Sequence, residues 1–165
     1  SKCRGNKKRS NGSNTIRILN FMKISLGTDH AGFEVKNNII NFLKSLGHEV
    51  IDCGTFSKDS CDYPDFAKEV AMNIINGKSD KGVLICGTGI GMAIAANKIK
   101  GIRAGVCWNV ETARLISLHN NANIICLGAR FLYIEEMFDM IKMYLETKFE
   151  ERHSKRILKI SEMEK

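Results

Sequence analysis

The stretch Gly82-Val-Leu-Ile-Cys-Gly-Thr-Gly-Ile-Gly-Met-Ala-Ile-Ala-Ala-Asn-Lys98 decides the fold. Its apolar run ending at Cys86 predicts a buried strand, its alternating glycines predict a tight turn, and its alanine-rich remainder predicts a helix. Glycines let backbone N–H groups approach a ligand closely, and a helix N-terminus adds about half a positive charge. The stretch therefore predicts an anion-binding turn between a strand and a helix.

The rest of the chain from residue 23 repeats this alternation of short β-branched runs and stretches with helical periodicity. Strands are predicted at residues 24–26, 50–53, 83–86, 103–107 and 124–127. Apolar residues recur with helical spacing at residues 39–46, 66–74 and 134–145, and Gly47 stands where a helix end favours positive φ. This alternation predicts a Rossmann-like α/β fold, a three-layer sandwich whose doubly wound parallel five-stranded sheet has helices on both faces.

In such sheets, ligands bind at the carboxyl ends of the strands, near the point where the strand order reverses. The segments that follow predicted strand ends are residues 27–32, residues 86–91 and the residues from Trp108 onward. We therefore expect the functional site to be built from these segments.

The charge of the chain is concentrated at its beginning. Residues 1–21 carry six basic and no acidic side chains, which leaves 19 basic and 18 acidic side chains in residues 22–165. A nearly neutral remainder does not predict a nucleic-acid-binding face, and no apolar run is long enough to span a membrane. We expect residues 1–21 to be a flexible basic extension, with a targeting peptide as the less favoured alternative. Residues 22–165 are expected to form a single domain that ends in a helix.

The chain has six cysteines but no C-x-x-C pair and no cysteine–histidine cluster with zinc spacing. Four of them end apolar runs, where cysteine commonly acts as a small buried hydrophobe. Free thiols and a reducing, cytoplasmic compartment are the simpler interpretation, and a thiol-redox protein is an alternative.

The glycine turn differs from two familiar phosphate-binding loops. It reads G-x-G-x-G, one residue short of the dinucleotide fingerprint, and no acid for a ribose follows about 20 residues later. It also lacks the Gly-Lys-Ser/Thr ending of a Walker loop. A nucleotide-binding module remains an alternative, but Cys86 at the mouth of the turn points to a reactive thiolate favoured by the helix N-terminus.

Other polar residues near predicted element ends each have an ordinary interpretation. Asp29 can start a helix, His30 can be a surface residue, and His119 can stabilise a helix C-terminus. Arg152 and Arg156, four residues apart, can belong to a solvated face or can grip a phosphate from one side. No one of these residues identifies the site.

Together, six motifs closely resemble the B-type ribose-5-phosphate isomerases of the ribose/galactose isomerase family. These motifs are Gly27-Thr-Asp-His-Ala-Gly32, His48-Glu-Val-Ile-Asp-Cys-Gly54, Asp62-Tyr-Pro64, Cys86-Gly-Thr-Gly-Ile-Gly91, Ala95-Ala-Asn-Lys98 and His119-Asn120. The resemblance extends from Met22 to the C-terminal helix. It implies interconversion of ribose 5-phosphate and ribulose 5-phosphate, through an enediolate, with no metal or organic cofactor.

The resemblance also implies roles for individual residues. Cys86 would be the base that moves the proton between C1 and C2, and His119, helped by Asp29 and Thr88, would protonate the ring oxygen. Asn120 would bind sugar oxygens. The other implied substrate contacts are the enediolate cradle of Gly87, Thr88, Gly89, Ile90 and Gly91, and the substrate- or phosphate-holding side chains of His30, Arg130, Arg152 and Arg156.

The resemblance implies a homo-oligomer, a dimer or tetramer, whose site lies between two subunits. His119, Asn120 and Arg130 would come from the neighbouring subunit. One branch of the family uses a glutamate after the glycine turn as base, but this chain has Met92 there, so Cys86 must serve. Galactose-6-phosphate isomerase subunits divide the motifs between two chains, whereas this chain carries both sets. Six-carbon sugar phosphates remain open as substrates.

Overall fold

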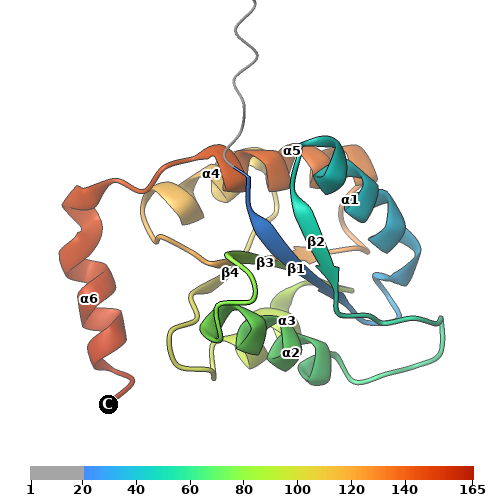
Figure 1. The fold of residues 1–165 in the computed structure, drawn as a ribbon, viewed down its shortest axis with the longest axis horizontal. Helices are drawn as coiled ribbons and strands as arrows, with labels where there is room; N and C mark the ends of the chain where they lie inside the picture. The colour runs from blue at the N-terminus through green and yellow to red at the C-terminus, as the bar shows by residue number, and fades with distance from the viewer. Residues whose placement is uncertain (1–20) are drawn as a thin grey trace, which may run out of the picture.

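The structure is a computed structural model that describes residues 21–165. The predicted extension at residues 1–21 lies outside this range except for its last residue. Figure 1 shows one twisted sheet between two layers of helices, with a last helix standing apart. The strands are β1 (Lys23–Thr28), β2 (Glu49–Asp52), β3 (Lys81–Cys86), β4 (Ala104–Val106) and β5 (Ile124–Gly128). The helices are α1 (Phe33–Ser45), α2 (Tyr63–Ile75), α3 (Ile90–Ala96), α4 (Val110–Leu118), α5 (Ile134–Glu146), the 3₁₀ turn η1 (Glu151–His153) and α6 (Ser154–Glu162).

The sheet has the order β2-β1-β3-β5-β4, and all its pairs are parallel. Parallel crossovers are almost always right-handed, so the direction of each step along the sheet decides which face its helix covers. The steps β1 to β2 and β4 to β5 run in one direction and place α1 and α4 on one face with α5. The steps β2 to β3 and β3 to β4 run in the other direction and place α2 and α3 on the opposite face (Figure 1). The predicted doubly wound fold is confirmed.

Each face of the sheet has its own hydrophobic core. Ile39 and Leu43 of α1 pack with Met137 and Ile141 of α5 on one face. On the other face, residues of α2 and α3 such as Val70 pack against the strands. The helical spacing read from the sequence therefore places these residues correctly.

Local features of the sequence explain where the helices begin and end. Gly47 follows α1 with φ of 91°, as its position predicts. Asn109 begins α4, because its side chain accepts a 2.8 Å hydrogen bond from the Thr112 N–H and so satisfies one of the free donors of the first turn.

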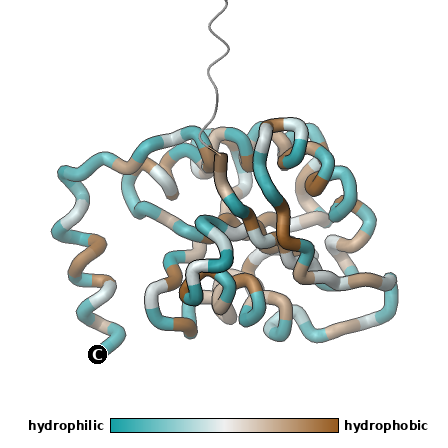
Figure 2. Tube along the Cα trace, in the orientation of Figure 1, coloured by the Kyte–Doolittle hydropathy of each residue, from teal (hydrophilic) through white to brown (hydrophobic). Residues whose placement is uncertain are grey.

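The C-terminal helix α6 has no buried residue. Leu158 and Met163 expose 61% and 84% of their surface, and Figure 2 shows apolar and hydrophilic residues alternating along the helix. One tie to the rest of the chain is a 2.9 Å hydrogen bond from the Gly101 N–H to Glu164 Oε1. An amphipathic helix of this kind has an apolar face available for packing. Within residues 21–165, no helix is long and apolar enough to cross a membrane.

His48, which is 4% exposed, is expected to make stability depend on pH. Burial lowers its pKa below the ordinary 6.5, against the opposing charge of Glu146, and its Nδ1 accepts a hydrogen bond from the Met22 N–H. Below the unfolded-state pKa, the unfolded chain binds more protons at this group than the folded chain does. The contribution of His48 to the free energy of unfolding should therefore be fully present above pH 6.5. It should be lost as the pH falls toward the lower native pKa.

The measurement is the urea midpoint at pH 7.5 and at pH 5. His48→Asn keeps an acceptor but cannot be protonated, so it should reduce the loss between the two conditions, whereas His30→Asn should leave that loss in place. An unchanged loss in His48→Asn would contradict this origin.

Candidate active site

Three neighbouring strand ends meet at one edge of the sheet. The Asp29 N–H donates to the Ile85 carbonyl at 3.2 Å, and the Ala129 N–H donates to the Cys86 carbonyl at 2.8 Å. These bonds continue the sheet past the ends of β1, β3 and β5. They bring together the segments that begin with Asp29, Cys86 and Arg130, at the point where the strand order reverses.

Cys86 lies at the bottom of the glycine turn and is 5% exposed. Its Sγ accepts a 3.1 Å hydrogen bond from the Gly89 N–H. The turn can close in this way because Gly89 has φ of 80°, and a Cβ there would lie 3.0 Å from the Leu127 backbone. The helix that follows, α3, has only seven residues, and the hydrogen-bond donor to the sulfur, the Gly89 N–H, belongs to the turn before it.

Asp29 and His30 leave β1 beside Cys86. Asp29 is 6% exposed, and its Oδ1 accepts hydrogen bonds from Ala31 and Gly32 at 2.9 and 3.3 Å. It therefore fixes the turn before α1, whereas the helix cap itself is Gly32. His30 Nδ1 accepts a 3.3 Å hydrogen bond from the Cys61 N–H, a contact that the sequence did not indicate.

Arg130 belongs to this half of the site. Its N–H donates to the Gly87 carbonyl at 3.1 Å. A Cβ added to Gly87 would lie 3.0 Å from the Arg130 guanidinium. The expectation that Arg130 joins the site from a neighbouring subunit together with His119 is wrong. Its backbone and side chain both pack against the turn of its own chain.

His119 and Asn120 lie at the opposite edge of the sheet. His119 ends α4, and the chain then enters β5 at its amino end, where the Gly82 N–H donates to Asn123. Cys86 is at the other end of β3, which has six residues. At a rise of about 3.3 Å per residue, the two groups are separated by roughly 16 Å along the strands.

At this second edge His119 lies beside His153 and near the acidic Glu150, and a basic hollow lies next to His153. The His119 and His153 rings are 4.6 Å apart between centroids. A hollow of about 450 Å³ is lined by Arg152, His153, Lys155, Arg156 and Lys159. Arg152 lies in η1 and Arg156 in α6, so the two arginines do not share one α-helix, and Arg152 Nε donates to Glu150.

His153 is a residue that the sequence reading missed. It is 6% exposed, and its Nε2 has no hydrogen-bond partner among residues 21–165. Burial and the charges of Arg152, His119 and Arg156 lower its pKa. Its position directly after Arg152 in a basic run was the available signal.

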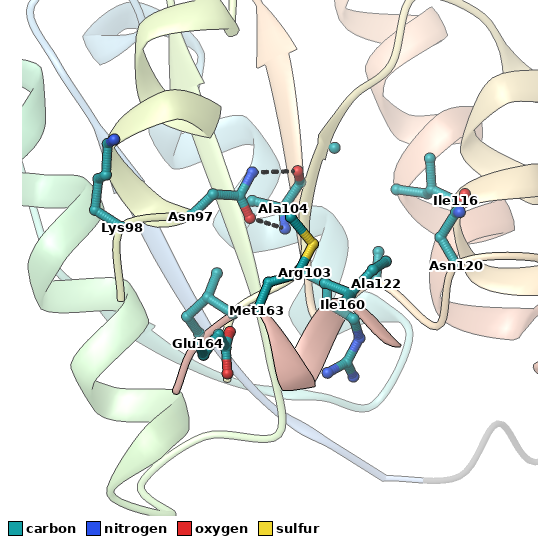
Figure 3. Close-up of a pocket in the computed structure, with 12 residues that line it drawn as sticks. Asn97, Lys98, Arg103, Ala104, Ile116, Asn120, Ala122, Ile160, Met163 and Glu164 are labelled. Carbon is teal, nitrogen blue, oxygen red and sulfur yellow. Dashed lines mark hydrogen bonds between the residues drawn. The ribbon is translucent and has the colours of Figure 1, made fainter. Parts of the chain in front are cut away.

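A hollow of about 670 Å³ lies between α6 and the edge strand β4, and Cys86 is not among the residues that line it. Figure 3 shows Ile160 of α6, and Met163 directly after the helix, near Arg103 and Ala104. The Asn97 side chain bridges to Ala104 with two 2.8 Å hydrogen bonds, one to the carbonyl and one from the N–H. Asn120 also lines this hollow. The hollow therefore adjoins the part of the site that contains His119.

Like Cys86, the other thiols described by the structure are free. Burial raises the pKa of Cys53 to about 11 and that of Cys107 to about 12, and it raises the pKa of Cys126 as well. Their interpretation as small buried hydrophobes is therefore sound for these three. In residues 21–165, no group of three or more potential ligands could hold a metal ion.

Tyr63 is a second residue that the sequence reading did not single out. Its ring lies against Gly91, the last glycine of the turn, where a Cβ would come within 2.6 Å of Tyr63 Cζ. Tyr63 is 40% exposed, so its ring forms part of the wall beside the turn. The Asp62-Tyr-Pro64 motif was the signal.

The fold and the site define an α/β enzyme that uses strand-end residues at the switch point of a parallel sheet. The model of the Ribose/Galactose Isomerase family matches residues 24–160. The chain belongs to this family, and the resemblance read from the motifs is confirmed.

The similarity to individual proteins supports this family assignment. Ribose-5-phosphate isomerase B of Escherichia coli is 42% identical over 143 residues, which cover 86% of this chain and 96% of that protein. The structure of ribose-5-phosphate isomerase B from Clostridium thermocellum matches with a TM-score of 0.85 and 47% identity, over 87% of this chain and 97% of that chain. That of Mycoplasma genitalium, with bound ribulose-5-phosphate, matches with a TM-score of 0.83 and 40% identity, over 88% and 97%.

We predict that Gly91→Ala lowers the free energy of unfolding by up to about 1 kcal/mol, because the new methyl must displace the Tyr63 ring, which is partly exposed and can move. Urea unfolding measures this change. In a Tyr63→Ala background the ring is absent, and the same substitution should be neutral or stabilise by up to about 1 kcal/mol, since alanine favours a helix over glycine. An equal loss in both backgrounds would show that the ring is not responsible.

Proposed function

We propose that this chain is an aldose–ketose isomerase that interconverts ribose 5-phosphate and ribulose 5-phosphate in the pentose phosphate pathway. The observation that carries the proposal is the buried Cys86 thiol, which accepts the Gly89 N–H at 3.1 Å beside Asp29. The five-carbon substrate is supported by the names of the relatives described above and by the ribulose-5-phosphate bound to one of them. The free thiols support a cytoplasmic location.

In this mechanism Cys86 acts as the base. Its thiolate takes the proton from C2 of the open-chain aldose, and the electron pair of that C–H bond forms the C1–C2 double bond of the enediolate while O1 takes the negative charge. The proton of the O2 hydroxyl then passes to O1, and the thiol returns its proton to C1, which leaves the carbonyl at C2 and the thiolate restored. The N–H bond to Sγ supports the thiolate, because a donor aimed at an anion stabilises it. Met92, at the position of the alternative base, is 0% exposed and packs in the core, so it supplies no competing base.

The turn residues Gly87, Thr88, Gly89, Ile90 and Gly91 would hold the enediolate oxygens. In the structure the Gly89 N–H donates to Cys86 Sγ at 3.1 Å and the Ile90 N–H donates to Thr88 Oγ1 at 3.2 Å, so these two donors would exchange those partners for an enediolate oxygen. A donor held at a developing oxyanion can be worth roughly 3 kcal/mol of barrier.

The remaining polar groups would open the ring and hold the sugar. His119 protonates the ring oxygen with help from Asp29 and Thr88, and Asn120 binds sugar oxygens. His30 and Arg130 at the Cys86 edge, and the basic hollow that contains Arg152 and Arg156 at the other edge, provide charge for the substrate and its phosphate.

This division of labour requires a second copy of the chain. Cys86 and His119 lie at opposite edges of the sheet, so they cannot contact one sugar within one chain. A symmetric pair would bring the Cys86 edge of each copy against the His119 edge of the other. Exposed apolar side chains lie near both edges, and a second copy could pack against them. These are Ile90, Ile94, Trp108 and Val110 near the first edge, and Leu158, Ile160 and Met163 on α6.

We predict that the wild-type chain isomerises ribose 5-phosphate with no added metal, and that Cys86→Ala lowers kcat by about 10²–10⁴-fold, the usual contribution of a general base. A coupled assay for ribulose 5-phosphate measures this change. Cys126→Ala is the matched control, because Cys126 is also a buried strand thiol, and it should retain activity. Near wild-type turnover by Cys86→Ala would exclude the proposed base. A higher kcat/KM for allose 6-phosphate would exclude the five-carbon assignment.

We also predict that two inactive variants restore activity when they share a dimer. Coexpressed Cys86→Ala and His119→Ala chains pair randomly, and each mixed dimer contains one site with neither substitution. The mixture should therefore reach about a quarter of the wild-type activity, although each variant alone is nearly inactive. Differently tagged chains allow the mixed dimer to be purified and assayed. No recovery in that species would show that each site is built from one chain.

A further inference from the structure

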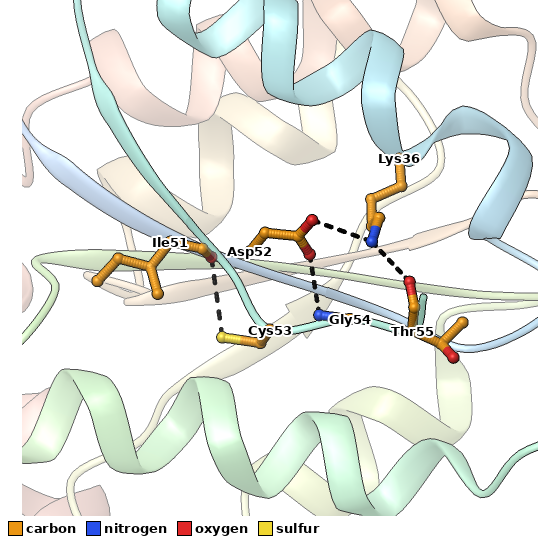
Figure 4. A network of polar contacts seen from close by, with 6 residues as sticks. All are labelled: Lys36, Ile51, Asp52, Cys53, Gly54 and Thr55. Atoms are coloured by element: carbon orange, nitrogen blue, oxygen red, sulfur yellow. Dashed lines mark hydrogen bonds and ion pairs between the residues drawn. The ribbon is translucent and has the colours of Figure 1, made fainter. Parts of the chain in front are cut away.

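Lys36 of α1 is a buried charge that the proposed mechanism does not use. It is 3% exposed, although lysines are almost never fully buried unless they are paired. Its Nζ donates to the Thr55 carbonyl at 2.6 Å, lies 3.0 Å from Asp52 Oδ2, and lies 4.3 Å from the centre of the Phe56 ring. Figure 4 shows Nζ between the Asp52 carboxylate and the Thr55 carbonyl, on the segment that follows β2.

The lysine fixes the beginning of the loop at residues 53–62. Asp52 accepts Nζ with one carboxylate oxygen and the Gly54 N–H, at 2.9 Å, with the other. Lys36 and Asp52 together therefore set the path of the backbone from residue 52 to residue 55 (Figure 4).

This segment is bonded to the strand that carries the site. The Thr28 N–H donates to the Gly54 carbonyl, and the Thr55 N–H donates to the Thr28 carbonyl, both at 2.7 Å. Thr28 is the residue directly before Asp29. The position of Thr55, held by Lys36, therefore fixes the backbone from which Asp29 and His30 project.

The same loop returns to the site at its far end, where the Cys61 N–H donates to His30 Nδ1 at 3.3 Å. The loop is thus hydrogen-bonded to Thr28 near its beginning and to His30 near its end. If its beginning shifts, the Thr28–His30 segment keeps its bond from the Asp29 N–H to Ile85 but loses the contacts that fix it from the side of the loop.

A purely stabilising role would not need a charge here. Buried ion pairs can often be replaced by apolar or neutral residues with no loss of stability, and what their loss removes is in some proteins a fixed geometry. Lys36 supplies directed bonds to one carbonyl and one carboxylate, which a methionine of similar length cannot make.

We propose that Lys36 is a positioning residue of the isomerase, which holds Thr55 against Thr28 and so orients Asp29 and His30 for the substrate. The inference rests on the proposed function for its kinetic consequence. Lys36 does not contact the sugar, and its effect passes through the loop.

The test compares Lys36→Met with the double variant Lys36→Met/Asp52→Asn. The single variant leaves the Asp52 carboxylate without its cation, so it should lower both the urea midpoint and kcat/KM. The double variant has no unpaired charge, and the amide oxygen of the introduced asparagine can still accept the Gly54 N–H, so its urea midpoint should return toward wild type. Its kcat/KM should stay reduced by roughly tenfold to a hundredfold, the usual cost of misplaced groups.

Two further measurements separate positioning from general damage. The His30 ring resonance in the NMR spectrum should move in both variants while that of His48 stays in place. The rate of Cys86 alkylation by iodoacetamide should remain that of wild type, because the turn after β3 makes none of these contacts. Lys58→Met is the matched control, since it removes an exposed ion pair with Glu34 at the same loop, and it should change nothing.

Recovery of kcat/KM together with stability in the double variant would overturn the positioning role, as would an unmoved His30 resonance. If the wild-type chain does not isomerise ribose 5-phosphate, the proposed function fails. The NMR and alkylation results still decide whether Lys36 orients His30.

Discussion

The hydrogen bonds from the Asp29 N–H to Ile85 and from the Ala129 N–H to Cys86 extend the sheet beyond its strands. Through them, three segments that are far apart in the sequence are held in a register that only the sheet can set. The glycine turn and Arg130 are joined further by the bond from the Arg130 N–H to the Gly87 carbonyl. This register places the Asp29 and Arg130 segments next to Cys86. The packing on both faces of the sheet prevents the strands from changing register.

The sequence was sufficient for the fold because its apolar runs are short, β-branched and regularly separated. All five strands were predicted to within about two residues at each end, and Gly47 and the turn after Cys86 were placed correctly. Their conformations depend on local rules such as helix ends and glycine φ. The ends differ because backbone pairing, and not side-chain character, decides where a strand stops.

The site was predictable only in part. The side chains were identified, but which of them share an edge depends on the path of the chain through space, and Arg130 was assigned to the wrong half for that reason. Lys36 was passed over because a lysine on a helix usually points to solvent. His153 and Tyr63 act through contacts with residues distant in sequence, which no periodicity encodes.

The bridge from Asn97 to Ala104 has a consequence for how the sheet can associate. The edge strand β4 has only three residues, and the Asn97 side chain occupies both the N–H and the carbonyl of Ala104. A free edge of this kind is a template for adding another strand, which is a route to aggregation. With these two groups occupied, the sheet cannot be lengthened at Ala104 by a foreign strand. The Asn97 amide, directly after α3, thus blocks strand addition at this position of the β4 edge.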